Sequence, residues 1–403
     1  MLSKEFKIYK EILFYTLIAV FIGIIVGVID AIFGGVLIWI SNIRNKYSMI
    51  LISLLPLAGI VVITLYTKFS KQALKGMTLI FQTGFGENEV IPKRLIPLAI
   101  ITTWITHLFG GSAGREGVAV QLGATVGHIL GRRINSKNNS RILLITGMAA
   151  GFGGLFQTPI AATFFAMEVL VAGSLQYEAL LPALVSACFA SYTSHALGLE
   201  KFSVTLDLNL NISPILVIKL IIAGIIFGIV GGTFAHVLVT AKKYLNIKIS
   251  HPIKRIFIIG CILSVLFIIL HIGRYCGLGT NLISESFSGG TIFSYDWLLK
   301  LILTVLTLAA GYQGGEVTPL FSIGASLGVV IGNILGLPIM FTAALGYIAV
   351  FGSATNTLFA PILIGAEVFG TDYILFFAII CSVAYVFNGN KTIYTSQRRY
   401  SLD

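Results

Sequence analysis

The sequence predicts an all-α polytopic membrane protein, built from two helical repeats of inverted topology with many short, broken helices. Of its 403 residues, 56% are hydrophobic and only 11% are charged, and the mean hydropathy is +0.94. Soluble domains contain about 25% charged residues. Several apolar segments reach or approach the roughly 20 residues that span a bilayer, and segments of the second half repeat those of the first. These observations exclude a water-soluble globule.

The apolar segments differ in length along the chain. Three are long enough to cross a membrane: residues 12–40, 48–67 and 214–240. Five others are short or interrupted by Gly or Pro: residues 118–131, 142–155, 159–173, 319–336 and 357–370. In hydrocarbon, an interrupted helix is tolerated only where its freed backbone groups face protein or a water-filled cavity. The breaks therefore predict a site inside the protein. The first apolar run is too long for a cleavable signal peptide, so we expect it to remain as a span.

The two halves of the chain match at a constant offset of 201 residues, the difference between 224 and 23. The sequence GIIVG at residues 23–27 matches GIIFG at 224–228, and GATVG at 123–127 matches GASLG at 324–328. Several matches in the same order and at one offset indicate an internal duplication. We therefore expect two membrane repeats, residues 1–201 and 202–403.

Basic residues lie on different sides of the first apolar segment in the two repeats. In the first repeat they precede it, at Lys4, Lys7 and Lys10, and in the second they follow it, at Lys242, Lys243, Lys248, Lys254 and Arg255. Cytoplasmic loops carry an excess of Lys and Arg. The two first spans are therefore expected to run in opposite directions, with both termini in the cytoplasm.

Other classes of function find little support. The net charge of +11 comes from basic residues at the chain ends and in short loops such as 132–137, so we expect no nucleic-acid partner. The four cysteines form no CxxC pair and the six histidines lack ligand spacing, which predicts core cysteines, no metal centre and no cofactor. An intramembrane enzyme would need motifs such as HExxH or GxSxG. The sequence contains neither, and we expect no enzymatic activity.

The sequence GGSAGREG at residues 110–117 directly precedes an apolar helix. Gly residues let backbone amides converge, and a helix N-terminus with its unpaired N–H groups favours an anion. The Glu116 carboxylate could occupy such a site itself and leave it on protonation, which would couple proton binding to anion movement. The alternative is a structural pair of Glu116 with Arg115.

The sequence GYQGGEVTP at residues 311–319 is the counterpart in the second half. Thr318 suits a helix cap and Pro319 a first helical turn. Glu316 is either a carboxylate that complements the helix dipole or part of a proton relay. A third segment, KGMTLIF at residues 75–81, says little alone.

Taken together, these motifs resemble the CLC family of anion channels and proton-coupled antiporters. The family order is GREG at 114–117, GLFQTP at 154–159 leading to Glu168, GEVTP at 315–319 and a late tyrosine, Tyr394. The resemblance covers essentially the whole chain. It implies a CLC-like fold and a homodimer in which each subunit has its own pathway.

Three departures from the chloride-type pattern resemble the branch of bacterial fluoride/proton antiporters. Val118 stands where chloride-type members usually have Pro, Met77 stands where a serine-containing motif is usual, and GEVTP replaces Gly-x-Phe-x-Pro. Val169 stands where chloride-type antiporters often have a second glutamate. The usual inner proton route is therefore in doubt.

The resemblance also implies roles for individual residues. Glu116 resembles the external gating glutamate and Tyr394 the central tyrosine, with Tyr400 close enough to be an alternative. Glu116 and Glu316 are the expected groups for gating and proton transfer. The anion pathway is expected to include Met77, Phe81, Gly114, Arg115, Gly117, Val118, Thr318 and Tyr394. Without the resemblance, we would interpret Met77 and Phe81 as ordinary core residues and Tyr394 as an aromatic residue at the membrane interface. Glu168 and Glu367 are expected to be structural carboxylates bonded to backbone amides.

The expected function is therefore proton-coupled fluoride export, an exchange of fluoride and protons across the bacterial plasma membrane that would confer fluoride resistance. A site for fluoride must replace its tightly held water with several hydrogen-bond donors. The alternatives are a chloride/proton antiporter and a passive anion channel of the same fold.

Overall fold

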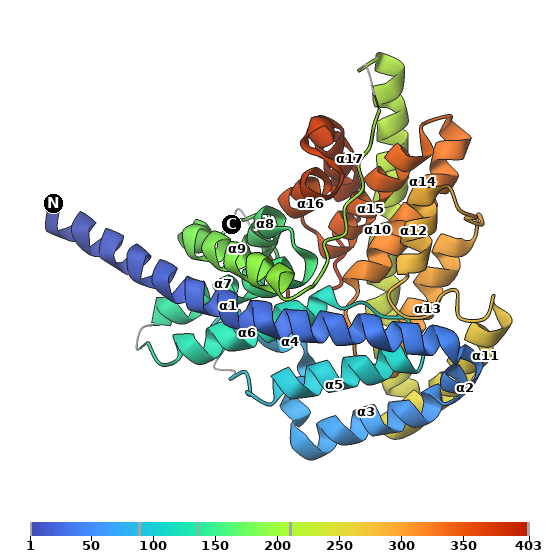
Figure 1. Cartoon of the computed structure of the whole chain (residues 1–403), viewed down its shortest axis with the longest axis horizontal. Coiled ribbons are helices and arrows are strands. Elements are labelled where there is room, and N and C mark those ends of the chain that lie inside the picture. The colour runs from blue at the N-terminus through green and yellow to red at the C-terminus, as the bar shows by residue number, and fades with distance from the viewer. Residues whose placement is uncertain (1, 88–89, 135–136, 209–211, 401–403) are drawn as a thin grey trace.

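The protein is described by a computed structural model that covers residues 2–87, 90–134, 137–208 and 212–400 (Figure 1). Almost all regular structure in these residues is helical, because the apolar chain satisfies its backbone groups within each segment. The helices of the first half are α1 (Leu2–Lys46), α2 (Ser48–Ser53), α3 (Leu55–Phe69), α4 (Met77–Gly84), α5 (Leu95–Leu108), α6 (Glu116–Gly131), α7 (Lys137–Phe156), α8 (Pro159–Glu168) and α9 (Leu180–Ala196).

The second half contains a matching series of helices. They are α10 (Pro214–Lys248), α11 (Pro252–Ile269), α12 (Thr280–Ser288), α13 (Asp296–Ala310), α14 (Val317–Leu335), α15 (Ile339–Thr355), α16 (Phe359–Phe369) and α17 (Ile374–Val386). Short 3-10 helices lie at η1 (Lys71–Lys75), η2 (Tyr177–Ala179) and η3 (Thr371–Tyr373). The strands β1 (Val171–Ala172) and β2 (Arg398–Arg399) pair in parallel and fasten the C-terminal segment to the first half.

The order of the helices repeats at the offset found in the sequence. Helix α5 begins at Leu95 and α13 at Asp296, 201 positions later, and α6 begins at Glu116 and α14 at Val317, again 201 positions later. The fold is therefore the predicted all-α membrane architecture of two helical repeats with many short helices. The boundary between residues 201 and 202 remains a prediction.

Glycines bring equivalent helix pairs into close contact in the two halves. A Cβ at Gly123 would meet the backbone of Gly147, and one at Gly324 would meet the backbone of Gly346. The first pair joins α6 to α7 and the second joins α14 to α15. Small residues at such crossings let helix backbones approach closely, which is how apolar helices gain packing energy within a membrane.

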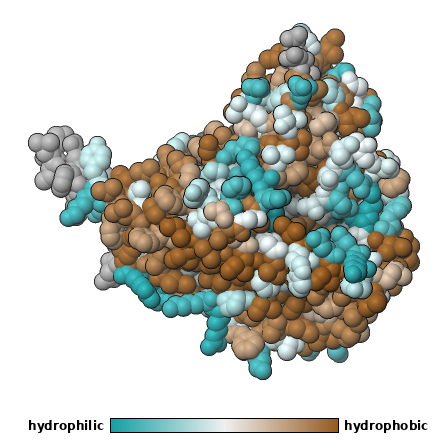
Figure 2. Space-filling model, in the orientation of Figure 1, coloured by the Kyte–Doolittle hydropathy of each residue, from teal (hydrophilic) through white to brown (hydrophobic). Residues whose placement is uncertain are grey.

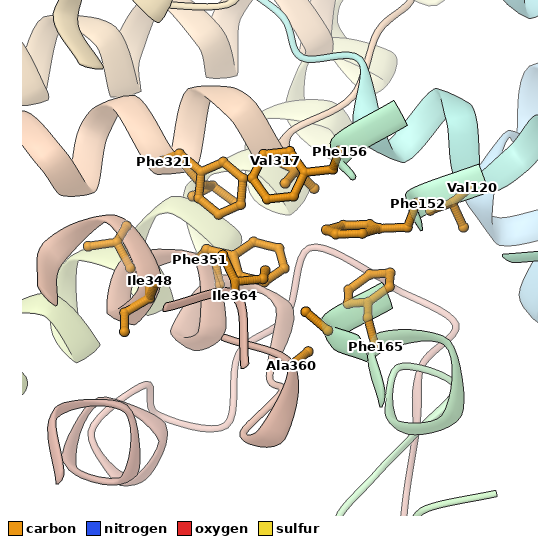
Figure 3. Packing of buried hydrophobic residues seen from close by; sticks show 14 of the residues in the cluster. Val120, Phe152, Phe156, Phe165, Val317, Phe321, Ile348, Phe351, Ala360 and Ile364 are labelled. Carbon is orange, nitrogen blue, oxygen red and sulfur yellow. The ribbon is translucent and has the colours of Figure 1, made fainter. Parts of the chain in front are cut away.

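Aromatic side chains join the two halves in the centre (Figure 3). The ring of Phe156, the last residue of α7, stacks on that of Phe321 in α14 with centroids 5.2 Å apart. Phe321 in turn stacks on Tyr347 of α15 at 4.0 Å. These three side chains are buried, so the two repeats form one packed core rather than two separate domains.

Two expectations about the apolar segments need correction. Residues 48–67 do not form one span, because α2 ends at Ser53 and α3 begins at Leu55. Among the described residues, four helices are long and apolar enough to cross a membrane: Tyr9–Lys46, Pro214–Lys248, Pro252–Ile269 and Val317–Leu335. The last of these covers nearly all of residues 319–336, a segment expected to be short or interrupted by Gly or Pro, and most of it is buried inside the protein.

Much of the protein surface is apolar, as expected for helices that face lipid. Figure 2 shows broad hydrophobic areas interrupted by smaller hydrophilic patches. On α1, Phe21 and Trp39 are both more than 60% exposed. The prediction that all cysteines are core residues is half wrong, because Cys276 and Cys381 are buried but Cys188 and Cys261 are exposed.

Candidate functional site

The two Gly-rich segments meet in the middle of the molecule. Gly114 and Gly315 form an isolated antiparallel bridge, in which each N–H donates to the other carbonyl at 2.5 and 2.7 Å. These residues are equivalent in the two repeats, since they are 201 positions apart. The bridge places the N-termini of α6 and α14 next to each other. Two interrupted helices therefore point their unpaired N–H groups into the same region, as an anion site requires.

The side chain of Glu116, the first residue of α6, lies across this meeting point. It is 1% exposed, and its Oε2 accepts hydrogen bonds from the Thr318 backbone N–H at 3.1 Å and from the Thr318 hydroxyl. Oε1 lies 3.6 Å from Nε of Arg115. The carboxylate thus occupies the N-terminus of α14, where the helix offers donors to an anion. Glu116 is thus paired with Arg115 and also accepts hydrogen bonds at the start of α14, and its role in gating remains a prediction.

Thr318 has a different place from the one predicted. The residue before α14 is Glu316, so Thr318 is the second residue of the helix and not its cap. Pro319 is the third helical residue, still within the first turn. The Thr318 hydroxyl donates to Glu116 of the other repeat. The sequence suggested a local role for this residue, but its partner lies 202 positions away in the chain.

A cavity of about 490 Å³ opens on one side of the bridge, and we call it the Glu316 cavity. Met77, Phe81, Glu316 and Tyr394 all line it. The rings of Phe81 and Tyr394 stack with centroids 5.2 Å apart, and both side chains are buried to at least 95%. The cavity therefore brings together four predicted site residues from three distant parts of the chain. Tyr400 is 62% exposed and does not line it, which favours Tyr394 as the tyrosine of the site.

A second cavity of about 550 Å³ contains Arg115 and is called the Arg115 cavity. Its other basic lining residues include Arg44 and Arg274. Arg274 is held by Asp296 and Glu285, with Nη2 2.7 and 2.8 Å from their carboxylate oxygens. Burial and these two carboxylates act in opposite directions, and the carboxylates keep the pKa of Arg274 above its usual range. Arg274 therefore stays protonated, and its charge is compensated by these two carboxylates.

The two cavities lie at opposite ends of helix α11. Pro252 and Arg255 at its start line the Glu316 cavity, and His271 and Ile272 just beyond its end line the Arg115 cavity. Eighteen helical residues span about 27 Å. That length is close to the thickness of a bilayer core. The cavities are therefore separated by a helix about as long as a bilayer core is thick, and Glu116 follows Arg115, which lines one of them.

The same cavities show that the repeats are inverted. The last part of α1, around Arg44, lines the Arg115 cavity, whereas the last part of α10, around Lys242, lines the Glu316 cavity. These helices are equivalent in the two repeats. In Figure 1, α1 runs across the view and α10 runs down it, so the two helices have different directions.

Glu316 faces its cavity with a partner that the sequence did not reveal. Its side chain is 14% exposed, and Oε1 lies 3.7 Å from Nζ of Lys242 on α10. A Cβ placed at Gly117 would lie 3.6 Å from Oε2, so the other oxygen borders the start of α6. One carboxylate oxygen of Glu316 therefore faces Lys242 on α10, and the other faces the segment that holds Glu116. The side chain links these two elements in addition to lying at the start of α14.

The remaining predicted residues are distributed around the bridge. Gly114 forms it, Gly117 lies beside Glu316, and Arg115 lines the second cavity. Val118 is 2% exposed and lines neither cavity. Its side chain is thus part of the packing behind the site.

Lys300 is a buried residue that sequence reasoning missed. Its ammonium group donates to the Ser112 hydroxyl at 2.8 Å and to the carbonyls of Tyr275 and Gly277 at 3.1 and 2.7 Å. It thereby ties the first Gly-rich segment to the second repeat. A lone Lys in the apolar run 297–310 was a usable signal, because ionisable residues at membrane depth are rare.

Glu168 and Glu367 are structural carboxylates, as predicted. Glu168 accepts hydrogen bonds from the backbone amides of Leu358, Phe359 and Ala360 at the start of α16. Glu367 accepts from Ile160 and Ala161 at the start of α8, at 3.3 and 2.7 Å. They satisfy helix N-termini that would otherwise be left without partners. Among the described residues no group of three His, Cys, Asp or Glu could hold a metal ion.

Comparison with known proteins agrees with this arrangement. The family model described as voltage gated chloride channel matches residues 58–389. A chloride/fluoride channel protein of Pseudomonas syringae pv. tomato is 35% identical over 86% of this chain and 78% of its own length.

Two solved structures have the same fold. The crystal structure of a CLC-type fluoride/proton antiporter superposes with a TM-score of 0.95 at 52% identity, covering 97% of this chain and 99% of that one. A slow cyanobacterial Cl⁻/H⁺ antiporter has a TM-score of 0.80 at 20% identity, over 94% and 96% of the two chains. The bridge between inverted repeats, the acid between two cavities and these matches lead to one conclusion: the chain belongs to the CLC family of voltage-gated chloride channels and related transporters.

Proposed function

We propose that this protein exchanges fluoride for protons across the membrane. The observation that supports this most directly is the position of Glu116, whose carboxylate accepts hydrogen bonds from the N–H and the hydroxyl of Thr318. Its neighbour Arg115 lines one cavity and Glu316 lines the other. The similarity to a CLC-type fluoride/proton antiporter and to a chloride/fluoride channel protein supports fluoride as the anion.

The exchange follows from competition for one set of donors. The ionised Glu116 carboxylate holds the donors of Thr318, and a fluoride ion, small and strongly hydrated, needs the same kind of charge-assisted hydrogen bonds. Protonation neutralises Glu116, weakens its hold on these donors and frees them for fluoride. Fluoride and the carboxylate thus alternate in the same place. Glu316 passes the proton between this place and the cavity beside it.

The other predicted site residues surround this place. Gly114 and Gly117 let the backbones of the two repeats approach, and Arg115 attracts anions from its cavity. Met77, Phe81 and Tyr394 form the wall of the pathway on the side of the Glu316 cavity, and Val118 packs behind it. Their placement in the structure supports these roles, and single substitutions test them.

The Glu316 cavity is the cytoplasmic one in this proposal. Lys242, Lys243, Lys248, Lys254 and Arg255 cluster at the junction of α10 and α11, on the side of this cavity. By the positive-inside rule this side faces the cytoplasm. The C-terminal segment with Tyr394 lines the same cavity, and α1 ends at the opposite face, so both termini are cytoplasmic. An inward proton gradient would then drive fluoride out of a bacterial cell.

We further infer that the protein is a homodimer of the plasma membrane with one pathway in each subunit. Each described chain has its own acid and its own two cavities, so a single subunit is sufficient for exchange. The substrates are fluoride and protons, and we propose no enzymatic activity.

The experiment that tests the function uses purified protein in liposomes loaded with fluoride or chloride. Fluoride efflux and external pH are recorded together. Fluoride efflux accompanied by proton uptake supports the exchange. Fluoride flux without proton movement would instead indicate a passive channel, and equal turnover of chloride would indicate a chloride/proton antiporter.

A further inference from the structure

We propose that Lys242 is a positioning residue for the exchange: it sets the pH at which Glu316 takes up a proton and, once Glu316 is protonated, it attracts fluoride into the Glu316 cavity. This inference rests on the proposed function. It assigns a role to a residue on α10 that no motif in the sequence indicates.

The geometry brings Lys242 to Glu316 from another part of the repeat. Lys242 lies near the end of α10, and its ammonium group is 3.7 Å from Oε1 of Glu316. The lysine is 41% exposed and the glutamate 14% exposed, so the pair lies at the boundary between cavity and protein. An ion pair in this position favours the ionised form of the acid.

The rest of the cavity makes this pair unusual. Among the residues that the structure describes, Glu316 is the only acid that lines it, whereas Lys75, Lys242 and Arg255 are all basic. Arg255 is directed elsewhere, since its guanidinium donates to the Ala310 carbonyl at 3.2 Å and to Asn246. Within the described part of the chain, Lys242 is the one basic residue within ion-pair distance of Glu316.

Other charged or titratable groups approach Glu316 from the elements around it. Arg115 and Glu116 lie at the start of α6, beyond Gly117, and Tyr394 lines the cavity from the C-terminal segment. Lys75 of η1 and Arg255 of α11 line the same cavity. Glu116 disfavours the ionised form of Glu316, and the basic residues favour it. In the described part of the chain, Lys242 is the group that forms an ion pair with Glu316.

The pair has two charge states with different consequences for fluoride. When Glu316 is ionised, it neutralises Lys242 and the cavity is less positive. When a proton reaches Glu316, Lys242 loses its counter-charge, and the positive charge of the lining increases by one. An unpaired ammonium group at the cavity wall raises the local concentration of anions. Proton arrival at Glu316 thereby promotes fluoride entry from the same side.

The test compares Lys242→Gln with Lys242→Arg and with Lys243→Gln in liposomes. Lys243 is the neighbouring lysine, is exposed and does not line the cavity. Fluoride-driven proton transport is measured while the pH on the side of the Glu316 cavity is varied. We expect Lys242→Gln to raise the pH of half-maximal exchange by about half to one unit, the range expected for a partly exposed pair.

For Lys242→Gln, the fluoride concentration that gives the half-maximal rate on the side of the Glu316 cavity should also increase, by about twofold to fivefold. Lys242→Arg keeps the charge and should restore both values, and Lys243→Gln should match the unmodified protein. A pH profile of Lys242→Gln that coincides with that of Lys243→Gln would overturn the inference. The inference would also be overturned if Lys242→Arg failed to restore the pH profile although this variant gave a single, monodisperse peak in size-exclusion chromatography. If the unmodified protein shows no coupled exchange, the proposed function itself fails.

Discussion

Glu168 and Glu367 bind the N-termini of each other's helices. Glu168 is the last residue of α8 and its carboxylate accepts amides at the start of α16, while Glu367 near the end of α16 accepts amides at the start of α8. The two acids are equivalent in the repeats, with an offset of 199 between 168 and 367. Each carboxylate compensates the unpaired donors of the partner helix. The reciprocal arrangement explains why both repeats retain an acid at this place, independently of transport.

Replacement of Glu168 by Gln is therefore expected to affect stability more than transport. Gln keeps one oxygen acceptor but loses the charge and the second acceptor, so amides of Leu358, Phe359 and Ala360 compete for one oxygen. The loss should be about 1–3 kcal/mol. Thermal unfolding in detergent measures it. Glu367→Gln is the matched control, with a smaller loss because Glu367 accepts only two amides.

Replacement of Glu116 by Gln should abolish coupled proton movement. Gln cannot bind and release a proton, so the alternation of carboxylate and fluoride at Thr318 stops. Proton transport driven by fluoride should decrease by about two orders of magnitude or more. Simultaneous recording of fluoride and pH in liposomes shows the loss. Normal proton coupling in this variant would contradict the proposed mechanism.

Replacement of Thr318 by Val should weaken the interaction with fluoride. The change keeps the shape of the side chain and removes the hydroxyl that donates to Glu116. Loss of one donor of this kind costs about 1 kcal/mol, so the fluoride concentration at half-maximal rate should increase roughly fivefold. Thr318→Ser retains the hydroxyl and serves as the control. Equal fluoride dependence in both variants would remove Thr318 from the site.

Replacement of Tyr394 by Phe separates the ring of this residue from its hydroxyl. The stack on Phe81 should persist, because it depends on the ring. If the hydroxyl donates to fluoride in transit, the rate at low fluoride should decrease about twofold to fivefold. Tyr400→Phe, at an exposed position, should leave transport unchanged. The reverse result would make Tyr400 the pathway tyrosine.

Much of the fold was predictable because it is repeated. The offset of 201 defines corresponding elements in advance, and the Gly-rich sequence before Glu116 indicates an anion site from local chemistry alone. The break at Leu54 was missed although the run 48–67 contains a signal for it, because Pro56 lies in the first turn of α3, where proline is favoured. Periodicity gives little information where helices are buried on all sides.

The contacts of the site were harder to predict than its members. Thr318 was predicted to cap its own helix, whereas its hydroxyl donates to Glu116 of the other repeat. Nothing in the sequence indicates this contact. The pairing of Lys242 with Glu316 likewise depends on the crossing of α10 with the start of α14, which only the folded chain defines. Tyr394 and Tyr400 are alike in sequence context and are separated by burial alone.

The bridge between Gly114 and Gly315 places the site on an approximate two-fold axis, but the acids around it do not follow that symmetry. By the offset of 201, the counterpart of Glu116 is Val317 and the counterpart of Glu316 is Arg115. An acid therefore borders the Glu316 cavity, and the equivalent residue at the Arg115 cavity is a guanidinium. Acidification of the two sides should consequently have different effects, because the Glu316 carboxylate can take up a proton and the Arg115 guanidinium is already protonated.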